Sequence, residues 1–335
     1  MTLSEDVPTA GEPCSPSISI VICGYNHERF VEQALDSVSS QTCQPTQLVI
    51  TDDHSSDETP SRIKKWATSH WPDAELVLNS RNVGFPAMLN SVVPLLTGDL
   101  VAIMSADDWM VHDRIERQLR AFEESPPTVG MVYGDMTEVD EDGTPTGQRW
   151  FDTDRMGPVP GSGDLFIPML TRACMSAPTV MMKRQLLVAA GPYDESLAAE
   201  DYDMFLRLSR LAEWRYLPGP MINYRVLSSS LSRSSVFTDT YRDGRLRLLR
   251  KHTDTSAEAD AIISARVSQM AVSRYFEGRS AQLTADDLRF VLRHDRSARN
   301  ALLWLAASMR VPGKSLGRLV SARDTAREHA RIRRA

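Results

Sequence analysis

The chain has 335 residues, of which 42% are hydrophobic and 24% charged, and its formal net charge is −6. This composition is that of a soluble globular protein, and the length predicts one large domain with extensions or two domains. The acidic balance argues against a general nucleic-acid-binding protein, because phosphate contacts need clustered Lys and Arg. No apolar run is long enough to span a bilayer. The 4 cysteines have no C-x-x-C spacing and no secretory leader is recognised, which favours a reducing compartment and argues against a structural zinc site.

Residues 1–16 carry Pro, Ser, Glu and Asp with little apolar content, which predicts a disordered leader. After it, runs of strand composition alternate with runs of helical apolar spacing. We expect strands at residues 17–23, 47–51, 75–78, 100–104 and 129–133, and helices at residues 27–41, 57–66, 86–96 and 112–124. This alternation predicts an α/β fold with a doubly wound, mostly parallel sheet flanked by helices.

Two adjacent carboxylates, Asp107 and Asp108, follow the apolar strand predicted at residues 100–104. In open α/β sheets, ligands bind at the carboxyl ends of the strands. Neighbouring carboxylates repel each other unless a cation or a hydrogen-bond donor shares them, and their oxygens suit Mg²⁺ or Mn²⁺. From these residues alone, a divalent-metal site and a solvated cap of the following helix both remain open.

Polar residues also follow two other predicted strands, namely Tyr25–Asn26 after the first and Asp52–Asp53 after the second. Right-handed crossovers place the carboxyl ends of parallel strands on one edge, so we expect both groups to converge with Asp107–Asp108. An Asx-turn is the alternative interpretation of Asp52–Asp53. The sequence lacks a G-x-G-x-x-G after the first strand, a complete phosphate loop, H-E-x-x-H and G-x-S-x-G. This argues against dinucleotide-binding proteins, P-loop proteins, metalloproteases and serine hydrolases.

The second half of the chain has a different pattern. Residues 142–164 are rich in Gly and Pro and predict a long flexible connection, of the kind that often forms a lid. Residues 177–184 predict a strand entering a helix. A further helix begins near residue 199 with three acids in its first turn, which are Glu200, Asp201 and Asp203. The helix dipole stabilises acids at a helix start, so a structural and a catalytic role both remain open.

From about residue 238 the apolar spacing is helical. We expect helices at residues 241–251, 257–276, 285–292 and 298–309. Residues 310–335 are rich in Arg. Such a stretch is compatible with a solvated helix, with a dimer contact, or with peripheral contact to an anionic membrane.

Several segments, in this order, resemble the motifs of the family 2 glycosyltransferases of the GT-A fold. They are Val21-Ile-Cys-Gly-Tyr-Asn26, Ser37-Val-Ser-Ser-Gln-Thr42, Val49-Ile-Thr-Asp-Asp-His-Ser-Ser-Asp-Glu-Thr59, Asn82-Val-Gly84 and Ala106-Asp-Asp-Trp109. The co-linear set is specific even though each piece alone is not. The resemblance covers roughly residues 17–230 and implies a GT-A type, Rossmann-like sheet.

By that resemblance the ligand is a nucleotide-diphospho sugar. Tyr25 would stack on the base, and Asp53 would hydrogen-bond the base edge. Asp107 would contact the ribose, and Asp108 would bind the Mn²⁺ or Mg²⁺ that bridges the diphosphate and neutralises the charge of the leaving group. The remaining donor-site candidates are Asn26, Arg81 and Asn82.

The resemblance also implies roles for the acids of the helix predicted near residue 199. Asp201 would be the general base that takes the proton of the acceptor hydroxyl, and Glu200 is the second candidate. The reaction would be a single displacement with inversion at the anomeric carbon. Asp203 is expected to have a structural role or to face solvent.

Two departures from the pattern of the family affect the expected site. Leu227 stands where many relatives have a histidine that can join the metal or diphosphate site, which leaves Arg225 or Arg233 as charge partners. Ser105 stands where relatives often have another acid. We therefore expect Asp107–Asp108 to form the metal site without a third carboxylate.

We expect a GT-A domain at residues 17–235, with a donor half at 17–135 and an acceptor half at 136–235, followed by a helical region at 236–335. The expected activity is transfer of a sugar from a UDP-sugar, or a related nucleotide-sugar, to a carbohydrate, lipid-linked or natural-product acceptor. The alternatives are a nucleotidyltransferase of similar fold and a non-catalytic nucleotide-sugar-binding protein. We expect a cytoplasmic protein without a nucleic-acid partner. Peripheral contact with the inner face of the membrane through the basic C-terminus, and a homodimer, remain open.

Overall fold

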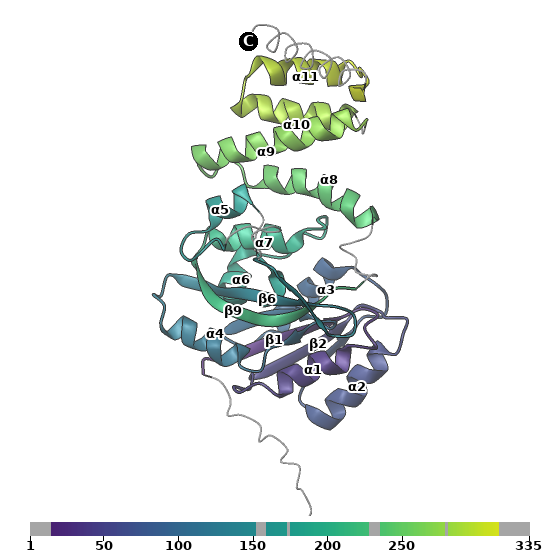
Figure 1. The fold of residues 1–335 in the computed structure, drawn as a ribbon, viewed down its shortest axis with the longest axis vertical. Helices are drawn as coiled ribbons and strands as arrows, with labels where there is room; N and C mark the ends of the chain where they lie inside the picture. Colours follow the sequence, from purple (N-terminus) through teal and green to yellow (C-terminus); the bar gives the residue numbers. More distant parts are fainter. Residues whose placement is uncertain (1–14, 152–158, 173–174, 228–234, 279–280, 315–335) are drawn as a thin grey trace, which may run out of the picture. The chain divides into compact units, whose positions relative to one another are not determined.

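The computed structural model describes residues 15–151, 159–172, 175–227, 235–278 and 281–314. The chain divides into two compact units, one up to Thr238 and one from Asp239 onward (Figure 1). Most of the predicted leader, Arg233, and residues 315–335 of the Arg-rich stretch lie outside the described residues.

The first unit opens with strands that alternate with helices. These elements are β1 (Ile18–Gly24), α1 (Val31–Ser39), β2 (Gln47–Asp52), α2 (Thr59–His70), β3 (Glu75–Leu78), α3 (Phe85–Val92), a 3₁₀ turn (Val93–Leu95) and β4 (Leu100–Ser105). β1 pairs in parallel with β2 and with β4, and β3 pairs in parallel with β2. Every residue of β1 is buried, as expected for a strand covered on both faces. The predicted α/β fold is confirmed.

The rest of this unit adds short elements and two long strands. They are β5 (Trp109–Met110), α4 (Arg114–Glu123), β6 (Val129–Val139), β7 (Pro145–Arg149), α5 (Phe166–Thr171), a 3₁₀ turn (Ala177–Thr179), β8 (Met181–Lys183), α6 (Arg184–Ala190), α7 (Glu200–Ser209) and β9 (Glu213–Arg225). The strands of the sheet follow the order β3-β2-β1-β4-β8-β6-β9-β5, and β7 pairs with β6. Helices α6 and α7 lie on one side of this sheet and α1 and α2 on the other (Figure 1).

The structure differs from the sequence prediction at β9, a strand of 13 residues that we did not expect. Its Pro218-Gly219-Pro220 segment has the composition of a turn. The register between β6 and β9 shifts beside this segment, between Gly134 and Asp135. The proline segment is therefore an irregularity inside a continuous strand. Similarly, β7 lies within the predicted long connection and forms a hairpin with β6.

The parallel register places the ends of three strands side by side. Cys23 of β1 pairs with Thr51 of β2 and with Ser105 of β4. The segments that follow these residues leave the sheet at one edge, where ligands bind in open α/β sheets. This register therefore determines where a site can form.

The second unit contains helices, and α8 begins just before its boundary. They are α8 (Ser235–Lys251), α9 (Ala257–Phe276), α10 (Ala281–His294) and α11 (Ala298–Ser308). The last three share a core that includes Tyr275, Leu288 and Leu303. Within this unit Asp287 is buried and forms ion pairs with Arg250 (3.2 Å) and Arg274 (3.3 Å).

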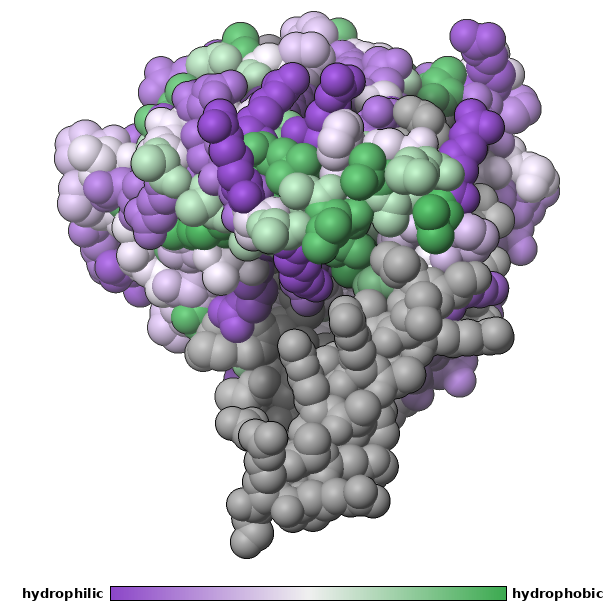
Figure 2. Space-filling view, turned by 90° about the horizontal axis from the view of Figure 1, so that it is seen from above, coloured by the Kyte–Doolittle hydropathy of each residue, from purple (hydrophilic) through white to green (hydrophobic). Residues whose placement is uncertain are grey.

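The face of α11 that does not join this core carries exposed apolar side chains. Leu302 and Leu305 on α11 and Met309 directly after it are exposed, and Figure 2 shows hydrophobic residues gathered in one patch of the surface in view. Within the described ranges, no helix combines the length and the apolar character needed to cross a membrane.

The buried ion pairs of Asp287 give a stability prediction for the second unit. Asp287→Ala removes the carboxylate that faces two guanidinium groups, and we expect it to lower the free energy of unfolding by about 3 kcal/mol. Urea unfolding followed by circular dichroism measures this change. Arg289→Ala, an exposed position on the same helix, is the matched control. Equal effects of the two substitutions would contradict the prediction.

Candidate active site

A tight turn after β1 carries Tyr25 and Asn26 to the edge of the sheet. Asn26 has a φ of +56°, a conformation that Asn tolerates better than most residues. Its N–H donates to Oγ of Ser55 (2.8 Å), and its Oδ1 accepts from the N–H of Ser56 (2.8 Å). Asp52 accepts from the N–H of Ser55 (2.9 Å), so the turns after β1 and β2 are joined. The side chain of Tyr25 is 39% exposed and is accessible to a ligand.

The carboxylate of Asp53 anchors the loop at residues 79–84. Its Oδ1 accepts from Nδ2 of Asn79 and from the N–H of Val83 (both 2.9 Å), and its Oδ2 accepts from the N–H of Gly84 (2.8 Å). Three of the roughly four acceptor positions of this carboxylate are therefore used within the protein. The loop also carries the exposed donor-site candidates Arg81 and Asn82.

Asp108 faces into the protein at the end of β4. It is 2% exposed, and its Oδ1 accepts from the N–H of Arg225 on β9 (2.8 Å). Burial and the neighbouring charge of Asp107 raise the pKa of Asp108 well above its usual value, and the positive charges of Arg225 and Arg114 oppose this rise. Asp108 therefore links the segment after β4 to β9 and lies near two buried cations, Arg114 and Arg225.

The carboxylate of Asp107 lies beside His27, which follows the turn after β1. Its side chain is 15% exposed, and its Oδ2 lies 3.8 Å from Nε2 of His27, too far for a hydrogen bond. Nδ1 of His27 is buried and has no hydrogen-bond partner in the part of the chain that the structure describes. Sequence reasoning missed His27, although a histidine directly after the Tyr25–Asn26 turn was a usable signal.

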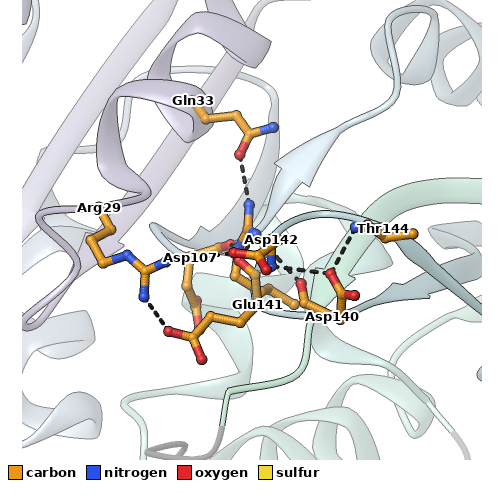
Figure 3. A network of polar contacts seen from close by, with 8 residues as sticks. Arg29, Gln33, Asp107, Asp140, Glu141, Asp142 and Thr144 are labelled. Carbon is orange, nitrogen blue, oxygen red and sulfur yellow. Dashed lines mark hydrogen bonds and ion pairs between the residues drawn. The ribbon is translucent and has the colours of Figure 1, made fainter.

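The guanidinium of Arg225 is held by groups from three parts of the first unit. Its Nε donates to the carbonyl of Asp107 (3.0 Å), and its Nη2 donates to Oε1 of Gln33 on α1 (2.6 Å). Its Nη1 donates to the carbonyls of Glu141 (2.5 Å) and Asp140 (3.5 Å) in the turn between β6 and β7. Figure 3 shows the residues that supply these acceptors, Gln33, Asp107, Asp140 and Glu141, gathered around the guanidinium group.

Two aromatic rings complete the environment of Arg225. The carbon Cζ of its guanidinium lies 4.4 Å from the ring centroid of Phe30 and 4.9 Å from that of Trp109. Sequence reasoning had left Arg225 open as a charge partner of the diphosphate. In the structure, all three of its side-chain nitrogens donate to protein acceptors.

The acids Glu200 and Asp201 begin α7. Burial, followed by the charge of Asp201, raises the pKa of Glu200 to about 8. Burial also raises the pKa of Asp201, although its Oδ1 accepts a hydrogen bond from the N–H of Tyr202 (2.7 Å) that opposes the rise. The two carboxyl groups therefore titrate as a pair, and one of them can retain a proton near neutral pH.

Asp203, the third acid of α7, has a structural role. It is fully buried and pairs with Nη2 of Arg207 (2.9 Å) one turn later. Arg207 also donates to the carbonyls of Ala190 and Gly191 at the end of α6. This pair fixes α7 against α6.

The segment before α7 connects the acid pair to the edge of the sheet. Asn90 of α3 donates to the carbonyl of Tyr193 (3.0 Å) and accepts from its N–H (2.7 Å). Burial raises the pKa of Tyr193, and the charges of Glu200 and Asp201 raise it further. Tyr193 is therefore within electrostatic range of the acids of α7, and its backbone is fixed to α3 by Asn90.

The predicted site residues thus fall into three groups. Tyr25, Asn26, Asp53, Arg81, Asn82 and Asp107 surround the edge formed by β1 to β4. Asp108 is behind that edge, against β9. Glu200 and Asp201 form a separate pair at the start of α7 and interact electrostatically with Tyr193. The roles that the sequence assigned to these residues stay predictions.

The carboxylates at this edge are a small donor set for a metal ion. Within the described residues there is no group of three or more His, Cys, Asp or Glu side chains that could hold one. Mg²⁺ and ions of similar chemistry are commonly bound by one or two carboxylates together with substrate phosphates. The partly exposed carboxylate of Asp107, with the buried Asp108 behind it, is compatible with an ion whose other ligands come from a diphosphate and water.

The fold is that of an open α/β protein in which ligands bind at the carboxyl ends of the strands. The chain belongs to glycosyl transferase family 2, whose family model matches residues 19–187. An uncharacterized glycosyltransferase of Rickettsia felis is 24% identical over 65% of this chain and 35% of its own length. A putative glycosyltransferase of Bacillus subtilis, EpsE, is 33% identical over 32% of this chain and 39% of its own length. The chain thus spans about a third of the length of these curated relatives. The family resemblance seen in the sequence is confirmed.

Solved structures show the same fold. Residues 1–349 of TarS from S. aureus, in complex with UDP-GlcNAc, match with a TM-score of 0.67 and 16% identity, over 90% of this chain and 92% of that one. The mannosyltransferase PcManGT from Pyrobaculum calidifontis, in complex with GDP-Man and Mn²⁺, matches with a TM-score of 0.56 and 18% identity, over 92% and 84%. The predicted GT-A fold is confirmed.

The acid pair of α7 gives a pH-dependent prediction. The raised pKa of Glu200 means that its contribution to stability is present below its unfolded pKa and is lost as the pH rises through about 8. Glu200→Gln removes this loss, so we expect the stability of the variant relative to the unsubstituted chain to increase as the pH rises from 4.5 to about 8. Urea unfolding across this range measures the difference.

The control for this experiment is Glu124→Gln, an exposed carboxylate at the end of α4. A stability difference for Glu200→Gln that is constant with pH would rule out the proposed proton on the acid pair.

Proposed function

We propose that this chain is a glycosyltransferase that moves a sugar from a nucleotide-diphospho sugar to the hydroxyl of an acceptor. One observation carries the proposal. The turns after β1, β2 and β4 meet at one edge of the sheet, in a fold shared with proteins whose structures contain UDP-GlcNAc or GDP-Man. A UDP-sugar is the proposed donor, because the TarS structure with the same fold contains UDP-GlcNAc.

The donor is proposed to bind along the edge of the sheet. The exposed ring of Tyr25 supplies a stacking surface for the base. Asp53 has about one acceptor position left, which suits the N–H of a base. The exposed loop residues Arg81 and Asn82 supply donors for the diphosphate, and Asn26 holds the turn that presents Tyr25.

The proposed metal is Mn²⁺ or Mg²⁺ beside Asp107 and Asp108. A bound ion of this kind neutralises the charge that develops on the departing nucleoside diphosphate. The family resemblance implied that Asp108 binds the ion and that Asp107 contacts the ribose. The geometry favours Asp107 as the direct ligand, because its carboxylate is partly exposed whereas Asp108 is buried and accepts from Arg225.

Asp201 is the proposed general base. A base must be ionised to take the proton of the acceptor hydroxyl. Burial raises the pKa of both acids, so the pair retains one proton near neutral pH and one carboxylate stays ionised. We assign the ionised role to Asp201, the position that the family resemblance indicates. A single base on one side and a leaving group on the other correspond to a single displacement with inversion.

The acceptor is proposed to be a hydroxyl of a carbohydrate, of a lipid-linked sugar or of a natural product. We also propose that the basic C-terminal residues contact the inner face of the membrane peripherally. A homodimer is the second partner that we propose. The Arg content of residues 310–335 is the observation that supports membrane contact.

Isothermal titration with UDP, GDP and TDP, with and without Mn²⁺, tests the donor site. We expect Mn²⁺ to tighten the binding of UDP. Asp107→Asn should reduce the gain in UDP affinity that Mn²⁺ produces by at least about tenfold. Even the loss of a residue that supports a metal ligand has an effect of that size. Asp108→Asn keeps an acceptor for the N–H of Arg225, so it should retain most of the tightening.

The reverse result for these two variants would return the ligand role to Asp108. If no nucleotide binds to the unsubstituted chain under either condition, the proposed donor class is wrong.

Asp201→Asn tests the base. We expect the rate of sugar transfer to fall by about 100-fold or more, the usual contribution of a general base, while the affinity for UDP is unchanged. Transfer is measured as the release of UDP in the presence of an acceptor that the unsubstituted chain glycosylates. Asp203→Asn is a structural comparison that should lower thermal stability more than Asp201→Asn does. Full activity of Asp201→Asn would refute the assignment of the base.

A further inference from the structure

We propose that Arg225 is a positioning residue that holds the Asp107–Asp108 turn in the geometry needed for binding of the metal and the diphosphate. This inference rests on the proposed function for the identity of the ligand. It does not require a direct contact between Arg225 and the donor.

The first argument is that Arg225 holds both carboxylate residues at the same time. Its backbone N–H donates to Oδ1 of Asp108 (2.8 Å), and its side-chain Nε donates to the backbone carbonyl of Asp107 (3.0 Å). One residue at the end of β9 therefore fixes a side chain and a carbonyl of consecutive residues. A rotation of the peptide between Asp107 and Asp108 would break at least one of these bonds.

The second argument is the geometry of the guanidinium slot, which we define by Phe30, Trp109, Gln33 and Glu141. The rings of Phe30 and Trp109 lie 4.4 Å and 4.9 Å from Cζ of Arg225. Gln33 and the carbonyl of Glu141 accept from the two terminal nitrogens. A planar group with donors along its edge satisfies such a slot, whereas the ammonium of Lys cannot reach all of these acceptors.

The third argument concerns the turn between β6 and β7, which closes one side of the slot. Arg29 of the α1 side pairs with Glu141 and lies 3.8 Å from Asp142 (Figure 3). Asp140 accepts from the N–H groups of Asp142 (3.0 Å) and Thr144 (2.8 Å), which makes the turn compact. The carbonyls that Arg225 contacts are therefore fixed independently of Arg225.

The fourth argument is that the side-chain nitrogens of Arg225 already donate hydrogen bonds within the protein. Nε, Nη1 and Nη2 each donate to a protein acceptor. A residue that bound a diphosphate directly would have to give up several of these bonds. The contacts therefore support an indirect role, in which Arg225 acts through the turn at Asp107–Asp108.

The test compares Arg225→Ala with Arg117→Ala. Arg117 of α4 is the matched control, because it also donates to β9, at the carbonyls of Pro218 (2.7 Å) and Pro220 (3.1 Å), but does not contact the turn. For Arg225→Ala we expect the tightening of UDP binding by Mn²⁺ to fall by about 10-fold to 100-fold, the range for residues that orient metal ligands. UDP binding without Mn²⁺ and the tightening in Arg117→Ala should be unchanged.

A second readout is independent of any donor. Hydrogen exchange of the ligand-free protein should be faster in Arg225→Ala at residues 105–110. In the unsubstituted protein, the N–H of Asp108 in this segment donates to the carbonyl of Ser105. Millimolar guanidinium chloride should restore both slow exchange and the tightening by Mn²⁺, because the free cation fits the vacated slot. Sodium chloride at the same concentration, and guanidinium with Arg117→Ala, should have no such effect.

The outcomes separate the two proposals. If Mn²⁺ does not tighten UDP binding in the unsubstituted chain, the proposed function fails in its metal part, and the exchange experiment still decides the role of Arg225. Unchanged exchange at residues 105–110 would overturn the positioning role. Loss of UDP affinity to the same extent with and without Mn²⁺ would also overturn it, because that result indicates a direct contact.

Arg225→Lys keeps the experiment decisive if the alanine variant does not fold. It retains the charge but not the planar fork, so we expect a smaller loss of tightening in the same direction and faster exchange at residues 105–110. Full retention of both properties by the lysine variant would contradict the inference.

Discussion

The parallel register of β1 with β2 and β4 is the constraint on which the candidate site depends. Because Cys23 pairs with Thr51 and Ser105, the chain leaves all three strands at the same level of the sheet. The turns that follow are short and are joined by hydrogen bonds, such as those between Asn26 and Ser56. A shift of one residue in any of these strands would move each following side chain to the other face. The register of the strands thus sets the location of the site, and the turns that follow them set the positions of its side chains.

Buried charge is the second organising factor. Asp108 and Arg114 are both almost inaccessible to solvent, and neither would be stable there without an opposite charge nearby. Burial lowers the pKa of Arg114 to about 9, and Asp108 opposes this shift. Arg225 adds a third charge that connects these groups to β9. Arg225 also interacts with the negative charge of Asp107, and more strongly than with that of Asp108, so all four groups form one charge network.

Much of the first half of the fold could be predicted from the sequence, because its strands are continuous apolar runs followed by polar turns. β1 was expected at residues 17–23 and is found at Ile18–Gly24. β9 was missed because its Pro-Gly-Pro segment has the composition of a turn, and only pairing with β6 makes it a strand. Motif reasoning placed Asp53 and Asp107 at the edge. It could not give the contacts of Asp53 with Val83 and Gly84, since these partners are distant in sequence.

The same limit applies to the acids of α7 and to Arg225. Composition alone does not distinguish Asp201 from Asp203, and only the family resemblance gave them different expected roles. The structure supplies a physical reason for Asp203, which pairs with Arg207, a residue that also bonds the end of α6. Arg225 and Gln33 are 192 residues apart, so no local pattern could reveal their contact. Residues whose role depends on strand order were accessible from sequence. Residues whose role depends on long-range side-chain contacts were not.

The bond between Asp108 and Arg225 also has a consequence for how the protein is made. It joins residues 117 positions apart, so β9 must be synthesised and docked before the carboxylate of Asp108 has this partner. A nascent chain that ends after residue 187, where the family match ends, already contains every residue proposed for the donor. It would nevertheless carry an acid at the end of β4 that β9 has not yet covered. Contacts of such high sequence separation form slowly, so we expect the donor site to be among the last parts of the first unit to mature after translation.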